Sequence, residues 1–146
     1  MASRAKVFRF SAPDTIEIAY NHYDGYPEGL GDNLEKYYKD NTEVADLIGG
    51  GSWSGMSDED GKVEYYDGGR PDIIKDENKD ELLFKLADEV MSVGYAYMWD
   101  GERWFAYTPE NKESFVQDVA RDIGHDINTD DMMMETYQRK WKKFIS

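Results

Sequence analysis

The side chains best suited to chemistry lie in one short stretch of the chain, Tyr20-Asn-His-Tyr-Asp-Gly-Tyr26. His22 and Asp24 are a candidate general base and the carboxylate that would orient it. Residues two apart share a face on a continuing strand, but Gly25 indicates that the strand ends here, so the sequence leaves this pairing open. A catalytic pair, a recognition site and a histidine at a strand end with a purely structural role all remain possible. The candidate ligand cluster comprises Tyr20, His22, Asp24, Gly25 and Tyr26.

Other catalytic and metal-binding motifs do not occur in the sequence. No Gly-x-Ser-x-Gly, phosphate-binding Gly-x-x-x-x-Gly-Lys or dinucleotide fingerprint is present, and the absence of cysteine excludes thiol catalysis and disulfides. The histidines His22 and His125 cannot form a zinc site without carboxylates from elsewhere. The calcium-loop spacing that starts at Asp126 places Asp131 where glycine is needed and Tyr137 where glutamate is needed. We therefore expect no metal and no cofactor.

Charge is the strongest global signal, because 31 acidic and 17 basic residues give a net charge of −14. Residues 1–10 and 132–146 each carry +3, which leaves −20 on residues 11–131. Such a field repels phosphates, so we expect no direct nucleic-acid binding. Two interpretations remain: a solvated acidic surface that keeps the chain in solution, or a decoy that occupies the basic nucleic-acid groove of another protein.

The acidic residues are concentrated in a glycine-rich segment, residues 49–78, which we predict to be a long irregular loop. A short strand candidate at residues 63–66 interrupts it. Its carboxylates outnumber Lys62, Arg70 and Lys75 and form the predicted partner-binding surface. These residues are Asp58, Glu59, Asp60, Glu64, Asp67, Asp72, Asp76 and Glu77.

The histidine stretch should follow a hairpin near residues 6–22. Ile16, Ile18 and Tyr20 alternate with polar or small residues, which predicts a return strand with His22 on the same face. Apolar residues then recur at helical spacing near residues 27–39, and a shorter helix is predicted over 42–48. The candidate cluster would therefore lie at a junction between strand and helix.

A second hairpin is predicted over residues 95–107, where Asp-Gly separates two aromatic runs. A two-residue turn would place Trp99 opposite Glu102 and Tyr97 opposite Trp104. One face would carry Tyr95, Tyr97, Trp99 and Trp104, and the other would carry Met98, Phe105 and Tyr107. Both faces are apolar, so both should be covered.

We predict one α+β domain over residues 1–146, with both hairpins joined in a single antiparallel sheet. Helices near 27–39, 79–93, 112–123 and 130–144 would cover this sheet. No run of residues reaches the length of a membrane span, and the N-terminus lacks the apolar stretch of a signal peptide. These features predict a cytoplasmic protein without a membrane partner.

Several motifs together resemble a family of small proteins from bacteriophages and mobile elements. They are Met1-Ala-Ser-Arg-Ala5, the stretch Tyr20 to Tyr26, Gly31 with Leu34 and Tyr37-Tyr38, and Leu47-Ile48 followed by Gly50 and Ser52. Members of that family typically begin Met-Ala-Thr-Arg-Ser and carry Tyr-x-His-Trp-Asp-Gly-Tyr, so Tyr23 here replaces a tryptophan. The resemblance covers the first third of the chain and, loosely, the aromatic hairpin. It implies a phage setting, in the cytoplasm of an infected bacterium, and no mechanism.

The leading functional hypothesis is a non-enzymatic phage accessory protein. It would bind and inhibit a host protein with a basic surface, such as a nucleic-acid-handling or defence factor, through a surface that mimics nucleic acid. The alternative is a small-ligand-binding or hydrolytic protein that uses the cluster of Tyr20, His22, Asp24 and Tyr26. The sequence does not predict the oligomeric state.

Overall fold

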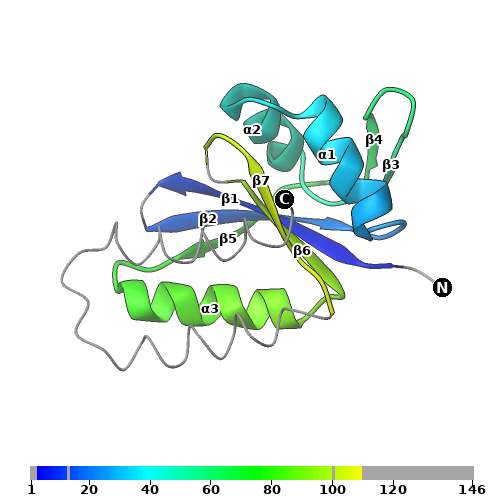
Figure 1. Cartoon of the computed structure of the whole chain (residues 1–146). Helices are drawn as coiled ribbons and strands as arrows, with labels where there is room; N and C mark the ends of the chain where they lie inside the picture. The colour runs from blue at the N-terminus through cyan, green and yellow to red at the C-terminus, as the bar shows by residue number, and fades with distance from the viewer. Residues whose placement is uncertain (1–2, 13, 100, 110–146) are drawn as a thin grey trace.

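A computed structural model describes residues 3–12, 14–99 and 101–109 of the chain. In this part, a sheet of seven strands has the order β4-β3-β2-β1-β6-β7, and β5 also pairs with β2 (Figure 1). The strands are β1 Ala5–Ala12, β2 Thr15–Asn21, β3 Trp53–Met56, β4 Val63–Tyr65, β5 Asp72–Lys75, β6 Tyr95–Trp99 and β7 Trp104–Tyr107. The helices are the π-helix η1 Pro27–Gly31 and the α-helices α1 Asp32–Tyr37, α2 Asn41–Gly49 and α3 Lys79–Met91.

The sheet is mixed, so the predicted purely antiparallel sheet is wrong. Strand β1 pairs antiparallel with β2 but parallel with β6. Helix α3 lies between β5 and β6 in the chain, and such a helical crossover lets two strands run in the same direction. Hairpin signals in a sequence report pairing between neighbouring strands, whereas the direction in which two hairpins join depends on this long connection.

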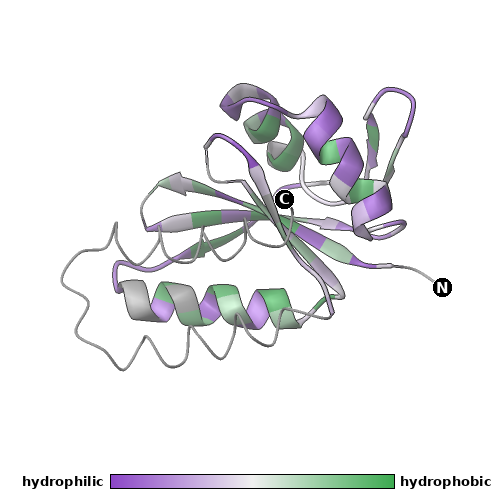
Figure 2. Ribbon diagram, viewed as in Figure 1, coloured by the Kyte–Doolittle hydropathy of each residue, from purple (hydrophilic) through white to green (hydrophobic). Residues whose placement is uncertain are grey.

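Each face of the sheet has its own hydrophobic core. Val7 and Phe8 are adjacent in β1 and point to opposite faces, as strand geometry requires. Figure 1 shows α3 on one face and α1 with α2 on the other. Figure 2 shows the alternation of hydrophobic and hydrophilic residues along α3 that such one-sided packing needs.

The core beneath α3 and the core beneath α1 and α2 differ in composition. The first contains Phe8, Ile16, Ile18, Leu82, Leu86, Ala87, Val90, Ala96, Met98 and Tyr107. The second contains Ala5, Val7, Ala19, Leu30, Leu34, Val44, Leu47, Ile48, Trp53, Tyr97, Trp99, Trp104 and Ala106. Most of the buried aromatic side chains therefore lie on the α1 and α2 side, close to the strand-to-helix junction.

The helices begin and end near the predicted residues, with one difference. The segment predicted as a single helix over 27–39 divides into η1 and α1, which ends at Tyr37. Asp40 caps α2 by accepting a hydrogen bond from the Glu43 backbone N–H at 2.8 Å, and Asn78 caps α3 in the same way. The helices predicted near 112–123 and 130–144 lie outside the described residues.

Residues 49–78 are more regular than predicted: the strand candidate at residues 63–66 is β4, and β3 and β5 are formed in addition. Strand β5 pairs antiparallel with the first half of β2, from Thr15 to Ile18. Strand β3 joins β2 at its other end, where Asn21 is paired with Trp53. Three or four residues in glycine-rich sequence give little periodic signal, and these strands form through pairing with distant partners.

The aromatic hairpin has a different register from the predicted one. Trp99 lies opposite Trp104, so residues 100–103 form a four-residue connection instead of a two-residue turn. The two indole N–H groups explain this choice: Trp99 donates to Asn41 Oδ1 at 2.7 Å, and Trp104 donates to the Tyr38 carbonyl at 2.8 Å. Because the shift is of two residues, Tyr95, Tyr97, Trp99 and Trp104 stay on one face, and Met98 and Tyr107 stay on the other, as predicted.

Candidate functional site

The strand-to-helix junction is built around a buried hydrogen bond between β2 and β3. Asn21 is fully buried, and its Oδ1 accepts from Trp53 Nε1 at 2.5 Å. The Asn21 amide nitrogen donates to the Tyr23 carbonyl at 2.7 Å. The Tyr23 backbone N–H in turn donates to the Ser54 carbonyl at 2.7 Å, so the chain follows β3 beyond the end of β2.

A sharp turn then directs the chain into η1. Asp24 has a φ of 56°, which an aspartate tolerates better than most residues. Gly25 lies so close to the N-terminal strand that an added Cβ would be 2.3 Å from the Ser3 carbonyl oxygen. The buried Tyr97 hydroxyl also donates to the Gly25 carbonyl at 2.6 Å. Only glycine fits this position, and it fixes where η1 begins.

The structure divides the predicted ligand cluster into two pairs. Tyr20 Oη lies 2.7 Å from His22 Nδ1, and the half-buried His22 ring meets Tyr23 edge to face at 4.5 Å between centroids. Asp24 Oδ1 lies 3.5 Å from the Tyr26 hydroxyl, which is a long contact. No hydrogen bond joins His22 to Asp24 in the part of the chain that the structure describes. The pairing of His22 with Asp24, which the sequence left open, is therefore not formed as a hydrogen bond, and the left-handed turn at Asp24 lies two residues after His22 in the chain.

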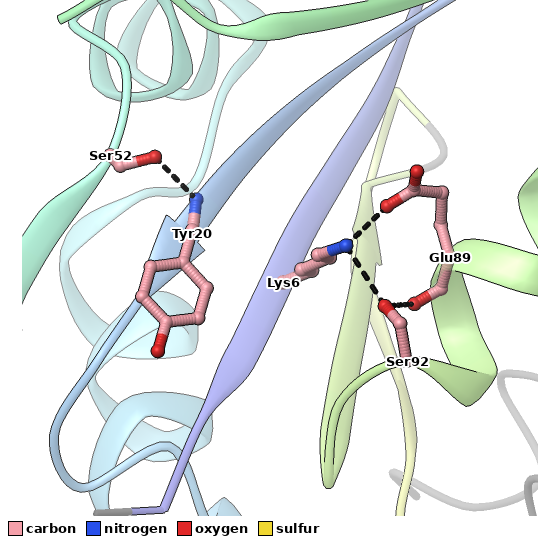
Figure 3. Close-up of polar contacts among 5 residues, drawn as sticks. All are labelled: Lys6, Tyr20, Ser52, Glu89 and Ser92. Atoms are coloured by element: carbon pink, nitrogen blue, oxygen red, sulfur yellow. Dashed lines mark hydrogen bonds and ion pairs between the residues drawn. The ribbon is translucent and has the colours of Figure 1, made fainter.

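The surroundings of Tyr20 offer no catalytic lysine. Lys6 lies opposite Tyr20 in β1, but its amine forms an ion pair with Glu89 and donates to Ser92 Oγ at 2.9 Å. Figure 3 shows the Lys6 amine directed toward the end of α3. The Tyr20 backbone N–H has a weaker contact with Ser52 Oγ, at 3.4 Å (Figure 3). Tyr20 and His22 thus form a polar pair at the end of β2.

The eight predicted partner-binding carboxylates do not form one group. Asp58, Glu59 and Asp60 lie in the connection between β3 and β4, and Glu64 lies in β4. Asp72 lies in β5 opposite Ile18 in the middle of β2, whereas Asp76 and Glu77 follow β5 beyond the Thr15 end of β2 on the approach to α3. Asp67 lies in the connection between these two regions. The different pairing sites of β3 and β5 on β2 cause this separation (Figure 1).

The two regions also differ in how far their charges are neutralised. Asp76 forms an ion pair with Lys85 at 3.0 Å. A hydrogen bond from the Asn78 backbone and the contact with Lys85 lower the pKa of Asp76. Asp58, by contrast, accepts a neutral hydrogen bond from Asn33 Nδ2 at 2.7 Å and forms no ion pair with the residues that the structure describes.

Hydroxyl groups from α1 and its C-terminal end hold the β3–β4 connection in place. The Tyr37 hydroxyl donates to the Asp58 carbonyl at 2.7 Å, and the Tyr38 hydroxyl donates to the Gly61 carbonyl at 2.6 Å. Burial raises the pKa of Tyr38 to about 12, so this hydroxyl keeps its proton at neutral pH. The Lys62 backbone N–H donates to Asp60 and lowers the pKa of that carboxyl group. The acidic connection is therefore fixed against α1.

The acidic connection and the strand-to-helix junction meet at Tyr26. The Asp24 carboxylate, 3.5 Å from the Tyr26 hydroxyl, raises the pKa of Tyr26 most, and Asp58 and Glu28 raise it further. Tyr23 beside them is 54% exposed. We call this region the junction surface; it consists of Tyr23, Asp24, Tyr26, Glu28, Asp58, Glu59 and Asp60.

Several residues that frame the site did not emerge from the sequence. Asn21 and Trp53 supply the buried bond, and Tyr97 holds the turn from a distant strand. Asn21 falls on the strand face of Glu17 and Ala19, the polar phase of the alternation, so no local signal marked it as buried. Nothing in the local sequence indicated that Trp53 binds Asn21 or that Tyr97 binds Gly25, because both contacts are long-range.

Three further findings bear on function. In residues 3–12, 14–99 and 101–109, no helix has the length and hydropathy needed to span a membrane. The same residues contain no group of three histidine or carboxylate side chains that could hold a metal ion. Comparison with protein-family models, curated protein sequences and solved structures found no match to the chain. The functional assignment therefore depends on the geometry of the site.

Proposed function

We propose that this chain is a non-enzymatic binding protein whose junction surface docks on a basic surface of another protein. In the phage setting implied by the sequence resemblance, the partner is a host nucleic-acid-handling or defence protein. The junction surface would occupy its nucleic-acid groove and inhibit it. The observation that carries the proposal is the exposed Tyr26 ring, whose hydroxyl lies 3.5 Å from Asp24 Oδ1 and whose pKa is raised first by Asp24 and then by Asp58 and Glu28.

The charge on this side of the molecule supports a basic partner. Residues 24–64 contain eleven acidic and three basic residues. In the described ranges, Asp24, Glu28 and Asp58 form no ion pair. Carboxylates without counter-charges attract a basic surface over a distance and raise its rate of association.

The exposed tyrosines support a protein partner. Tyr23 and Tyr26 expose large rings with polar tips beside the carboxylates. Tyrosine is enriched in protein interfaces, because it supplies contact area at a small cost in conformational entropy. An acidic surface that served only for solubility would not need these rings.

The proposed surface is smaller than the one predicted from sequence. Asp76 and Glu77 are excluded because they lie beyond the Thr15 end of β2, where Lys85 already pairs with Asp76. Asp72 is excluded because it belongs to β5, opposite Ile18, and not to the β3–β4 connection. The exclusion provides a matched control, since both regions can lose the same number of charges.

The test is affinity capture from a bacterial lysate at low and high salt, followed by a nucleic-acid-binding assay on each captured protein. The junction variant carries Glu28→Gln, Asp58→Asn and Glu59→Gln. The control variant carries Asp67→Asn, Asp72→Asn and Glu77→Gln. We expect the wild type and the control to capture a basic protein at low salt and to block its nucleic-acid binding. The junction variant should lose this capture, and salt above physiological strength should weaken it because exposed charges are screened.

Equal loss in both variants would show that only net charge matters and would contradict the proposal. Capture of a protein whose nucleic-acid binding is unaffected would contradict the mimicry. The capture assay tests whether the junction surface binds the partner, and the nucleic-acid-binding assay tests whether that binding blocks the groove.

A second candidate function is favoured by the contact between Tyr20 Oη and His22 Nδ1 at 2.7 Å. A phenol and an imidazole at this distance can share a proton with a bound small molecule. The comparison of His22→Ala with the junction variant separates the two candidates. Loss of activity in His22→Ala alone would favour a small-ligand-binding or hydrolytic protein.

A further inference from the structure

A small cavity lies between α1 and the aromatic hairpin, next to the junction surface. Its volume is about 80 Å³, and its lining includes Gly31, Asp32, Glu35, Tyr97, Trp104 and Ala106. Pro27 also lines it, and Pro27 directly follows Tyr26 of the junction surface. A larger open hollow of about 390 Å³ adjoins it and shares Glu35 and Trp104 with it.

The aromatic walls of this cavity are fixed before any ligand binds. The Tyr97 hydroxyl donates to the Gly25 carbonyl at 2.6 Å, and Trp104 Nε1 donates to the Tyr38 carbonyl at 2.8 Å. Gly31 packs on the Tyr97 ring so closely that an added Cβ would lie 3.1 Å from it. A preformed cavity reduces the entropy that binding must overcome.

The charged groups that line the small cavity are both carboxylates, Asp32 and Glu35. They are three residues apart on α1, so they lie on the same side of the helix. In the described part of the chain, Glu35 forms no hydrogen bond and no ion pair. Partial burial, and then the nearby Asp32 carboxylate, raise the pKa of Glu35. A cation in the cavity would stabilise the charged Glu35 carboxylate against both its burial and its repulsion by Asp32.

We propose that this cavity receives the guanidinium group of one arginine side chain from the partner protein. The identity of the partner rests on the proposed function, whereas the recognition of the guanidinium rests on the cavity itself. A planar guanidinium can stack on an aromatic wall and donate to two carboxylates at once, which a lysine ammonium cannot do as well. The neighbouring hollow is lined by Lys39 and Arg103 as well as by Glu35 and Glu102, so its lining has no excess of negative charge to attract a second cation.

The test uses the full-length chain, labelled with ¹⁵N, and three amino-acid probes of similar size whose blocked termini carry no charge. These are N-acetyl-argininamide, N-acetyl-lysinamide and the neutral N-acetyl-citrullinamide. The Trp104 indole N–H signal reports occupancy. We expect a saturable shift with the arginine probe, a weaker response with lysine and none with citrulline. Loss of one charge-assisted contact in Glu35→Gln should weaken binding by about tenfold.

Two controls separate recognition from a structural effect. Glu77→Gln removes one charge from an exposed position outside both the cavity and the junction surface and should leave the affinity for the arginine probe unchanged. The pKa of Glu35, followed by NMR of its side-chain carboxyl, should fall when the arginine probe saturates the wild type. Asp32→Asn provides a second variant on the same rim.

Equal responses to arginine and citrulline, or equal affinities in the wild type and Glu35→Gln, would overturn the proposal. The arginine probe could give no response while capture of the partner still depends on Glu28, Asp58 and Glu59. That result would contradict the cavity proposal and support the proposed function. If the probe binds as expected and no partner is captured, the cavity proposal stands and the proposed function falls.

Discussion

Trp53 donates its indole N–H to the side-chain oxygen of Asn21 across 2.5 Å, and neither residue is exposed to solvent. This bond joins the end of β2 to the start of β3, where the two strands share one ladder position. It positions the junction surface from beneath, because the Asn21 amide nitrogen also binds the Tyr23 carbonyl.

The first prediction concerns this buried bond. Asn21→Leu leaves the Trp53 N–H and the Tyr23 carbonyl without partners, and each unsatisfied buried group costs about 1–3 kcal/mol. The free energy of unfolding, measured by urea denaturation, should fall accordingly. In a double-mutant cycle of Asn21→Leu with Trp53→Phe, the loss of unfolding free energy in the double variant should differ from the sum of the two single losses by about 0.5–3 kcal/mol. Strictly additive effects would mean that the bond contributes nothing.

The second prediction concerns the close approach of the turn to the N-terminal strand. An added Cβ at Gly25 would lie 2.3 Å from the Ser3 carbonyl oxygen and 2.8 Å from Ala5 Cβ. Gly25→Ala should therefore lower the free energy of unfolding by about 1–3 kcal/mol, as overpacking does. Gly49→Ala is the control, since a Cβ added there would meet no atom within 4 Å. Similar losses in both variants would show that the effect is not steric.

The third prediction concerns pH. The raised pKa of Glu35 means that its carboxylate binds a proton more readily in the folded chain than in the unfolded chain. This residue therefore reduces stability as the pH rises through its raised pKa. We expect Glu35→Gln to have a higher Tm than the wild type at pH 7. The difference should shrink as the pH falls and vanish below the usual glutamate pKa of 4.5.

A net-charge control accompanies this measurement. Glu59→Gln removes the same charge from the exposed β3–β4 connection. A gain in Tm of the same size in this variant would assign the effect to overall repulsion instead of the local burial of Glu35.

The fourth prediction concerns the register of the aromatic hairpin. The Trp99 and Trp104 rings lie 5.2 Å apart with an interplanar angle of 57°, a tilted arrangement in which the two indoles couple electronically. We expect an exciton couplet in the circular dichroism spectrum of the wild type. Either Trp99→Phe or Trp104→Phe should abolish it. A couplet that survives either change would favour the alternative register, in which Trp99 faces Glu102.

Local patterns in the sequence identified elements well. Alternation located β1 and β2, and the helical spacing of apolar residues over 42–48 and 79–93 located α2 and α3. The two faces of the aromatic hairpin follow from period-two alternation alone. Each of these features depends on residues within one or two turns of the chain.

Pairing between strands that lie far apart in the chain could not be predicted from the sequence. The parallel contact between β1 and β6 depends on where α3 returns the chain. The division of the acidic residues between two regions depends on β3 and β5 joining different parts of β2. The spacing of His22 and Asp24 suggested a pair, but the left-handed turn at Asp24 separated them. These outcomes were set by the packing of distant segments.

The outer edge of β2 is shared, because β5 covers residues 15–18 while β3 joins only at Asn21. Between them, the Tyr20 amide has only a serine hydroxyl at 3.4 Å as its partner on this side. Such a break in the ladder favours separate opening of the segments on either side of it. We expect amide hydrogen exchange to reveal two cooperative units, with β3 and β4 exchanging before α3. The junction surface would then readjust to a partner without disturbing the core beneath α3.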